Sequence, residues 1–238
     1  HWSEPDWNNH YLKKVLELTD ALLDDSRGDY LVGITDLHAG MDALVSLRGP
    51  QELCFDLMDD PEPVLRALDE TYRVFDPIYR RLHRQVAARQ KGSTNWMGVV
   101  HPEGWYVTGC DFMCMISHEM YKEFVEPGVR HEIALFGNAI FHLDGPGALK
   151  HLDSLLLLPE LQAIQWVYGA GQPPAREWIP VLKRIQAAGK GIQLSIVPED
   201  LPPLLEALRP EGVHFSCWCA SPDEADALVR MAERAYMR

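Results

Sequence analysis

The stretch AIFHLDGPG, residues 139–147, runs from an apolar strand into a polar strand end. Residues 139–141 are apolar, His142 and Asp144 stand two positions apart, and Gly-Pro-Gly at 145–147 ends the run. Because side chains alternate across a strand, His142 and Asp144 are predicted to project from the same face. In a βα barrel the C-terminal ends of the strands hold the active site, which is where this pair would lie.

The pattern of this stretch repeats along the chain. From residue 29 onward, short apolar runs alternate with longer helical patterns, which indicates βα units around a mainly parallel sheet. The predicted strands are residues 30–35, 96–100, 106–111, 139–143, 161–167, 191–197 and 212–218. This number falls at or just below the eight that close a barrel. We therefore expect one α/β domain over residues 1–238, a (β/α)8 TIM barrel that is incomplete at its N-terminus, with residues 1–28 as an N-terminal helical segment.

Helix boundaries are marked by capping residues and prolines. Asp60 precedes Pro61, so it is expected to cap a long one-sided helix with proline at its first position. Ser117 is expected to cap another helix, which Pro127 would end or kink. The segment Ser221–Glu224 has the pattern of a capping box and predicts the start of the last helix.

The charge balance excludes several classes of partner. The chain has 22 basic and 35 acidic residues, a net charge of −13, which repels nucleic acid and anionic lipid. Its longest apolar run, residues 155–158, is too short to span a bilayer. Five cysteines, an odd and sparse set, favour a reducing compartment without disulfides. The expectation is a cytoplasmic protein that acts on a small molecule, without a nucleic-acid or membrane partner.

His142 and Asp144 are the main candidates for chemistry. Together they could bind a divalent metal ion, or act as an acid/base pair in which Asp144 orients the imidazole. The structural alternative is that His142 bonds a neighbouring loop and Asp144 caps the next helix. Cys217 could join them across the barrel mouth as a soft ligand, although alternation along residues 212–218 leaves open whether Cys217 or His214 faces inward.

Other candidates stand at the ends of predicted strands. Asp111 is a candidate catalytic carboxylate at the end of the run 106–111. The candidate substrate-binding residues, each with a purely structural role as the alternative, are Asp36, His38, Trp96, Gln165 and Trp166. The sequence lacks a G-x-S-x-G elbow, a phosphate loop of the GxxxxGK[ST] type and a G-x-G-x-x-G fingerprint. Serine hydrolysis, nucleotide hydrolysis and Rossmann redox chemistry therefore lose support.

Two segments in fixed order resemble a known superfamily. Residues 111–127 contain an Asp…Ile-Ser…Tyr…Glu-Phe…Pro pattern, and the sequence Phe-His-Leu-Asp-Gly follows at 141–145. This pair is similar to the uroporphyrinogen decarboxylase superfamily, which also contains corrinoid methyltransferases. The Arg-Gly at 48–49 and the Asp-Pro-Glu at 60–62 resemble it as well, so the likeness extends from about residue 30 to the C-terminus. It implies a (β/α)8 barrel.

The resemblance also implies a reaction. The zinc methyltransferases of this superfamily carry His-x-Cys-Gly where this chain has His142, Leu143, Asp144 and Gly145, so a carboxylate replaces one thiolate. Cys217 stands roughly where their later cysteine ligand is expected. The resemblance implies a metal-dependent methyltransferase acting on a small thiol or a corrinoid-linked methyl group. Its cofactors would be zinc, held by His142, Asp144 and Cys217, and a corrinoid that carries the methyl group. Its partner would be a corrinoid protein or a second copy of the chain.

Two alternatives stay open at this point. In a metal-free uroporphyrinogen-type decarboxylase, a carboxy-lyase, Asp36 or Asp111 would stabilise a protonated pyrrole and His142 would transfer protons. In a non-catalytic ligand-binding barrel, Gln165 and Trp166 would contact the ligand without any reaction.

Overall fold

The structure, a computed structural model, describes residues 3–236 and has an α/β architecture, which confirms the predicted class. Its five strands form one sheet in the order β1-β2-β3-β4-β5. The described residues thus contain five of the eight strands that a closed barrel needs. By internal packing the chain divides into two compact units, His1–Ala139 and Ile140–Arg238, which are described separately.

The first unit is mainly helical. It contains α1 (His10–Ser26), α2 (Gly40–Arg48), α3 (Pro50–Asp59), α4 (Pro61–Ala87), β1 (Tyr106–Gly109), the 3-10 turn η1 (Asp111–Met115), α5 (His118–Met120), the π turn η2 (Tyr121–Val125) and α6 (Glu126–Phe136). Helix α4 begins at Pro61 as predicted, although the Asp60 side chain makes no capping hydrogen bond. Ser117 caps as predicted, since its Oγ accepts from the Met120 amide at 3.2 Å. The helix that Ser117 caps does not end at Pro127, but its regular α geometry is interrupted by the π turn η2 directly before Pro127, which lies in the first turn of α6.

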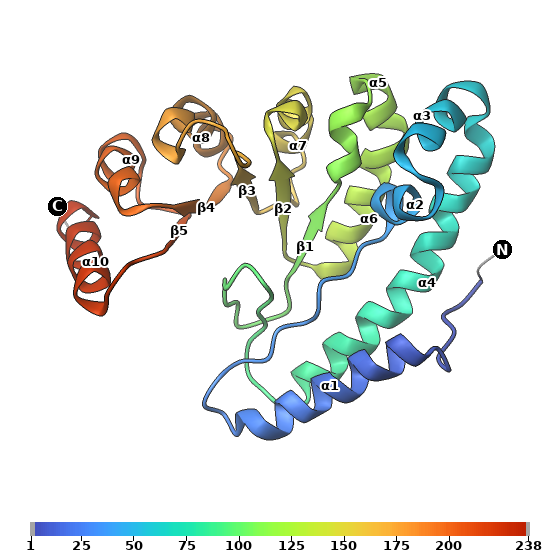
Figure 1. Ribbon diagram of the computed structural model, residues 1–238, viewed down its shortest axis with the longest axis horizontal. Coiled ribbons are helices and arrows are strands. Elements are labelled where there is room, and N and C mark those ends of the chain that lie inside the picture. The colour runs from blue at the N-terminus through green and yellow to red at the C-terminus, as the bar shows by residue number, and fades with distance from the viewer. Residues whose placement is uncertain (1–2, 237–238) are drawn as a thin grey trace. The chain divides into compact units, whose positions relative to one another are not determined.

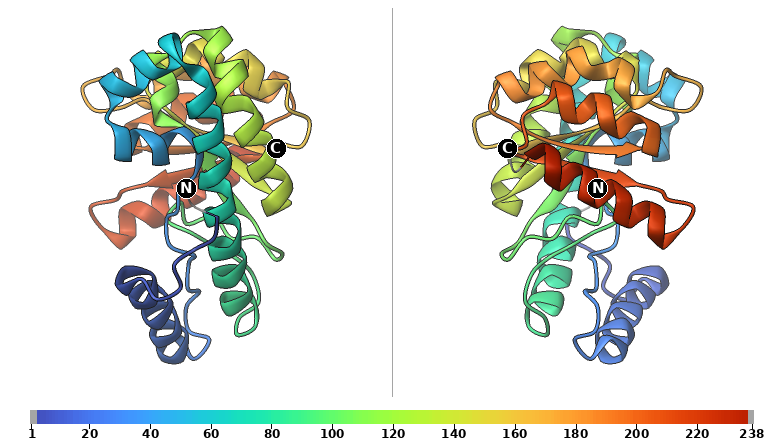
Figure 2. Two further views of the ribbon diagram at one scale, coloured as in Figure 1. Left: turned by 90° about the vertical axis from the view of Figure 1, so that its right-hand side faces the viewer. Right: turned by 90° about the vertical axis from the view of Figure 1, so that its left-hand side faces the viewer.

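Helix α4 supplies much of the first unit's core. Its apolar residues recur at helical spacing and bury one face, which includes Val64, Leu68, Phe75, Tyr79 and Leu82. Helix α1 lies alongside the C-terminal part of α4 (Figure 2), and the Gln85 side-chain amide donates to the Leu16 carbonyl at 2.9 Å. The predicted N-terminal helical segment is therefore packed on α4.

Two predicted strands, 30–35 and 96–100, are absent from the structure. The second falls in a loop that closes on itself, because the amide and carbonyl groups of Ser93 and His101 bond each other at 2.8 and 3.0 Å in an isolated antiparallel bridge. Gly92 and Gly98 take positive φ values of 94° and 71° in this loop, a conformation that a regular strand does not allow. One backbone hydrogen bond links the 30–35 segment to the same loop, from the Ile34 amide to the Thr94 carbonyl, and the segment joins no ladder.

The second unit alternates strands and helices. Its parallel strands are β2 (Ala139–Asp144), β3 (Ala163–Val167), β4 (Gly191–Ile196) and β5 (Val213–Cys217). The segments that follow these strands are η3 (Pro146–His151), α7 (Leu152–Leu156), η4 (Ala175–Trp178), α8 (Ile179–Ala187), η5 (Pro198–Asp200), α9 (Leu201–Ala207) and α10 (Pro222–Tyr236). Figure 1 shows α7, α8 and α9 along one side of these strands. One half of the predicted capping box is present at α10, because Ser221 Oγ accepts from the Glu224 amide at 3.2 Å. The Glu224 carboxylate accepts from the Ala220 amide at 2.6 Å and not from the amide of Ser221.

Register places the strand residues of the second unit in rows. Leu143, Trp166, Leu194 and Phe215 are aligned across β2 to β5, and the first three are at most 1% exposed, so this row faces the helices. The neighbouring rows project from the opposite face, because adjacent residues of a strand alternate. We call that opposite side the polar face; it carries His142, Asp144, Gln165, Gln193, Ser195, His214 and Ser216. No described helix is long and apolar enough to cross a membrane.

Candidate functional site

One row of the polar face consists of hydrogen-bonding side chains alone. His142, Gln165, Gln193 and His214 are register partners on four consecutive strands. Gln165 and Gln193 are 5% and 2% exposed, and burying amides costs free energy unless they are hydrogen-bonded. A run of polar groups at this depth is therefore costly for a purely structural sheet and suited to binding a polar ligand.

His142 is held by its neighbour in this row. Its Nδ1 forms a short hydrogen bond with the Gln165 Oε1 atom. Because a side-chain carbonyl oxygen only accepts, Nδ1 is the donor of this hydrogen bond. With Nδ1 as the donor, Nε2 is the ring atom that could ligate a metal ion. Gln165, predicted as a substrate-binding residue, thus contacts His142.

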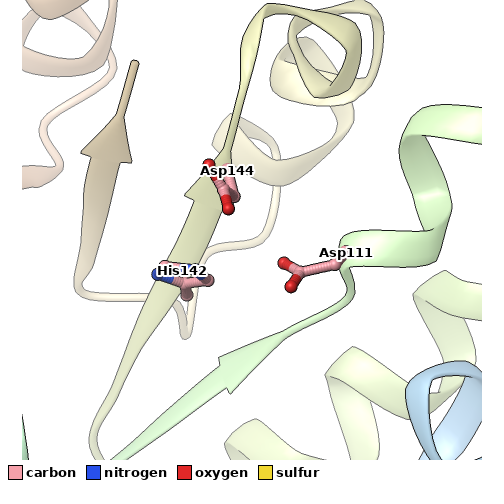
Figure 3. Close-up of side chains that lie close together, drawn as sticks. All are labelled: Asp111, His142 and Asp144. Carbon is pink, nitrogen blue, oxygen red and sulfur yellow. The ribbon is translucent and has the colours of Figure 1, made fainter. Parts of the chain in front are cut away.

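Asp144 projects from the same strand end as His142 (Figure 3). A ring nitrogen of His142 and a carboxylate oxygen of Asp144 lie within 4.8 Å of each other, close enough for one ion to contact both. The strand ends here because Gly145 takes a positive φ of 77° and its amide donates to the Val167 carbonyl at 2.8 Å. The prediction that His142 and Asp144 share one face of the strand end is confirmed.

Gln193 was not among the predicted site residues. Its Nε2 donates to Ser216 Oγ at 3.1 Å, whereas its Oε1 is buried without a hydrogen-bond partner among the described residues. An unpaired buried acceptor costs about 1–3 kcal/mol, so a donor from a bound ligand would relieve it. The signal in the sequence is the alternation of β4, which places Gln193 on the polar face once the register is known.

Trp166 and Cys217, two other predicted site residues, lie away from the polar face. Trp166 belongs to the row that faces the helices, is 1% exposed, and packs edge-on against Trp178 with ring centroids 5.1 Å apart. Cys217 pairs with Ile196, a buried residue of the helix-facing side, so its sulfur projects from the side opposite to His142. Burial and a hydrogen bond with Cys219 raise the pKa of the Cys217 thiol to about 11.

Asp111 opens η1 directly after β1 in the first unit (Figure 3). Its backbone amide donates to Asp42 Oδ2 at 2.9 Å, and the next amide, of Phe112, donates to Asp42 Oδ1 at 3.1 Å. Asp42, on α2, therefore satisfies the first amides of this turn and fixes where the Asp111 carboxylate starts. No local sequence pattern predicts this contact, because 69 residues separate Asp42 from Asp111.

Asp36, His38 and Trp96 form a cluster in the first unit, so three of the predicted substrate-binding residues are brought together. The two Asp36 oxygens contact the Trp96 indole Nε1 at 3.2 Å and the His38 Nε2 at 3.2 Å. His38 Nδ1 faces Asp42 at 4.0 Å, so the imidazole lies between two carboxylates. A cavity of about 620 Å³ is lined by His38, Asp42 and Asp111 together with apolar side chains of Val45, Phe112 and Met115. Its size and mixed lining suit a small molecule.

A buried carboxyl supports β1 from behind. Glu132, on α6, is 6% exposed, and its carboxyl accepts hydrogen bonds from Thr108 Oγ1 at 2.5 Å and Tyr72 at 3.4 Å. Burial raises the pKa of Glu132 to about 7, and the two hydrogen bonds oppose that rise. Glu126, on the same helix, differs, because Lys122 and Arg130 outweigh the effect of burial and lower the pKa of its carboxyl.

Comparison with known proteins identifies no relative. No protein-family model matches the chain, and neither the curated proteins nor the solved structures contain a significant match. The resemblance of residues 111–127 and 141–145 to the uroporphyrinogen decarboxylase superfamily therefore stays a prediction.

Proposed function

We propose that the chain is a metal-dependent enzyme in which His142 and Asp144 bind a divalent metal ion. The observation that carries this proposal is the proximity of an imidazole nitrogen and a carboxylate oxygen on one strand end, with the imidazole held by Gln165. We further propose Asp111, which opens η1 directly after β1, as the third ligand, because a further carboxylate would complete the three protein ligands that a catalytic metal ion takes.

The donor set decides which ions fit. One imidazole and two carboxylates give nitrogen and oxygen ligands without sulfur, a set suited to zinc and also to manganese or iron(II). Cys217 is left out of this proposal, because its side chain projects from the other side of the sheet. When bound at this centre, the ion would act as a Lewis acid and lower the pKa of a thiol or a water molecule.

The residues of the chain would then have separate tasks. Gln165 holds the His142 ring in one orientation, and Asp42 holds the start of η1, so that neither ligand needs to be ordered when the ion arrives. Gln193 would accept a hydrogen bond from the substrate through its buried Oε1.

For the reaction we propose methyl transfer to a small thiol, with a corrinoid-linked methyl group as donor, in a barrel of the uroporphyrinogen decarboxylase type. The resemblance of residues 111–127 and 141–145 supports this choice. Incubating the zinc-loaded protein with a methylated corrinoid and a panel of small thiols, in parallel with uroporphyrinogen, tests it. Thioether formation that is lost in Asp144→Asn supports methyl transfer, whereas carboxylate loss from uroporphyrinogen in metal-free protein would support the decarboxylase instead.

The proposal that Asp111 is a ligand of the metal ion can be tested separately. Asp111→Asn keeps the shape of the side chain but removes its negative charge, so we expect weaker binding of zinc or Mn²⁺ with the fold unchanged. Isothermal titration of both ions into the wild type, Asp111→Asn and Asp144→Asn measures this. Asp36→Asn is the matched control, since Asp36 contacts His38 and Trp96 and is not a proposed ligand. If Asp111→Asn binds like the wild type while Asp144→Asn does not, Asp111 is not a ligand.

Gln165 is expected to affect metal affinity only by holding His142 in place. Gln165→Leu removes the acceptor of the Nδ1 hydrogen bond, and loss of such an outer partner costs about 10–100-fold in metal affinity. Gln165→Glu restores an acceptor and should keep the affinity at or above the wild-type value. Gln193→Leu, in the same row without a contact to His142, serves as the control in the same titration. Equal affinities for Gln165→Leu and Gln193→Leu would show that Gln165 does not orient the ligand.

A further inference from the structure

Cys217 and Cys219 form a pair of thiols at the C-terminal end of β5. Both are free and partly exposed, and their side chains share a hydrogen bond. Cys219 Sγ also approaches the Cys217 carbonyl, and Cys217 Sγ approaches the Trp218 carbonyl, each at 3.9 Å. Trp218, between them, is 86% exposed, so this strand end is open to solvent.

The surroundings of the pair favour a cation. The carboxylates of Glu224 and Asp200 both act electrostatically on Cys217. Glu224 is held in place by its 2.6 Å bond from the Ala220 amide, whereas the charge of Asp200 is paired with Arg176 at 2.9 Å. Negative charge opposes the formation of free thiolates, but a bound cation would be attracted by it.

The number of ligands narrows the kind of cation. In the described part of the chain, no third histidine, cysteine or carboxylate completes a ligand group with these two sulfurs. Structural zinc takes four ligands, and catalytic zinc takes three from the protein. A pair of thiolates without further donors suits a soft monovalent ion such as Cu(I), which thiolate sulfur prefers and which accepts two sulfurs in a line.

We propose that Cys217 and Cys219 form a binding site for a soft monovalent metal ion, separate from the His142 and Asp144 centre. On binding, each thiol releases its proton to solvent and its sulfur bonds to the ion, with no change in oxidation state. The two sites differ in chemistry, since one offers nitrogen and oxygen and the other sulfur. Cys217 also projects from the side of the second unit's sheet opposite to His142.

Thiol protection in the wild-type protein tests the site without any variant. The full chain is treated with Cu(I) under anaerobic, reducing conditions, alkylated, and mapped by mass spectrometry. We expect one Cu(I) per chain to protect Cys217 and Cys219 while the exposed Cys114 stays reactive. Equal alkylation of all three, or protection that follows the total number of cysteines, would overturn the proposal.

Variants then assign the ligands. In competition with a Cu(I) chelator, Cys217→Ser and Cys219→Ser should each lose the tight site, whereas Cys114→Ser and His142→Ala should keep it. Cu(I) should also change the fluorescence of the wild type, and Trp218→Phe should bind Cu(I) but lose this change. A tight site that persists in both Cys217→Ser and Cys219→Ser contradicts the proposal, as does its loss in His142→Ala.

Discussion

Replacing His142 by alanine is expected to abolish specific binding of zinc or Mn²⁺ to the second unit. The substitution removes the only nitrogen ligand of the proposed centre, so its effect should exceed the about 10–100-fold loss that follows when an outer partner such as Gln165 is removed. The fold should survive, because the side chain is only half-buried on the polar face. Isothermal titration, with thermal unfolding recorded on the same samples, measures both effects.

The control for this substitution lies in the same row of the sheet. His214 is the register partner of Gln193 on β5 and presents a second imidazole on the polar face, and it is not a proposed ligand. Burial lowers the pKa of His214, so its neutral form dominates at neutral pH. His214→Ala should therefore bind either ion like the wild type. Similar losses in the two alanine variants would mean that imidazoles bind the ion without a defined site, and would refute the proposed centre.

The second large effect concerns pH and stability in the first unit. Burial raises the pKa of Glu132 to about 7 in the folded chain, from the ordinary value of 4.5. Between these values the folded state binds more protons than the unfolded state, so the free energy of unfolding falls as the pH rises from about 4.5 to 7. Glu132→Gln removes this titration. We expect the variant to gain stability relative to the wild type by an amount on the order of 3 kcal/mol at pH 8, with little of that gain at pH 5.

Urea unfolding of both proteins at pH 5 and pH 8 measures this difference. Glu126→Gln is the matched control on the same helix, and its expected effect on the free energy of unfolding has the opposite sign. Because Lys122 and Arg130 overcome the effect of burial and lower the pKa of Glu126, its charged form stabilises the fold, and this contribution is lost as the pH falls through the lowered pKa. The control should therefore be less stable than the wild type at pH 8. A difference between Glu132→Gln and the wild type that is the same at both pH values contradicts the assignment.

The strands of the second unit could be predicted because each is a short stretch rich in apolar residues that alternates with a longer helical pattern. The runs near 139–143, 161–167, 191–197 and 212–218 each correspond to a strand within two residues. The run at 30–35 looks the same in the sequence but forms no ladder, because its neighbour at 96–100 is a loop closed by the bridge from Ser93 to His101. Apolar content alone does not show whether a partner strand exists.

The candidate site was predictable only where one strand was enough. Alternation within β2 placed His142 and Asp144 on one side without any knowledge of their neighbours. The side of the sheet from which Cys217 projects depends on register between strands that are distant in sequence, and so does the place of Gln193 in the polar row. The support of Asp111 by Asp42 is a tertiary contact for which no local pattern exists.

The bond between His142 and Gln165 has a consequence for how tightly a ligand can bind. Immobilising a side chain on association costs about 0.5–1.5 kcal/mol in lost rotamer freedom. Here the ring is already confined by a neighbouring strand of the same sheet, so this entropy is lost when the sheet forms and not when the ion binds. The imidazole should consequently keep one orientation in the ligand-free protein.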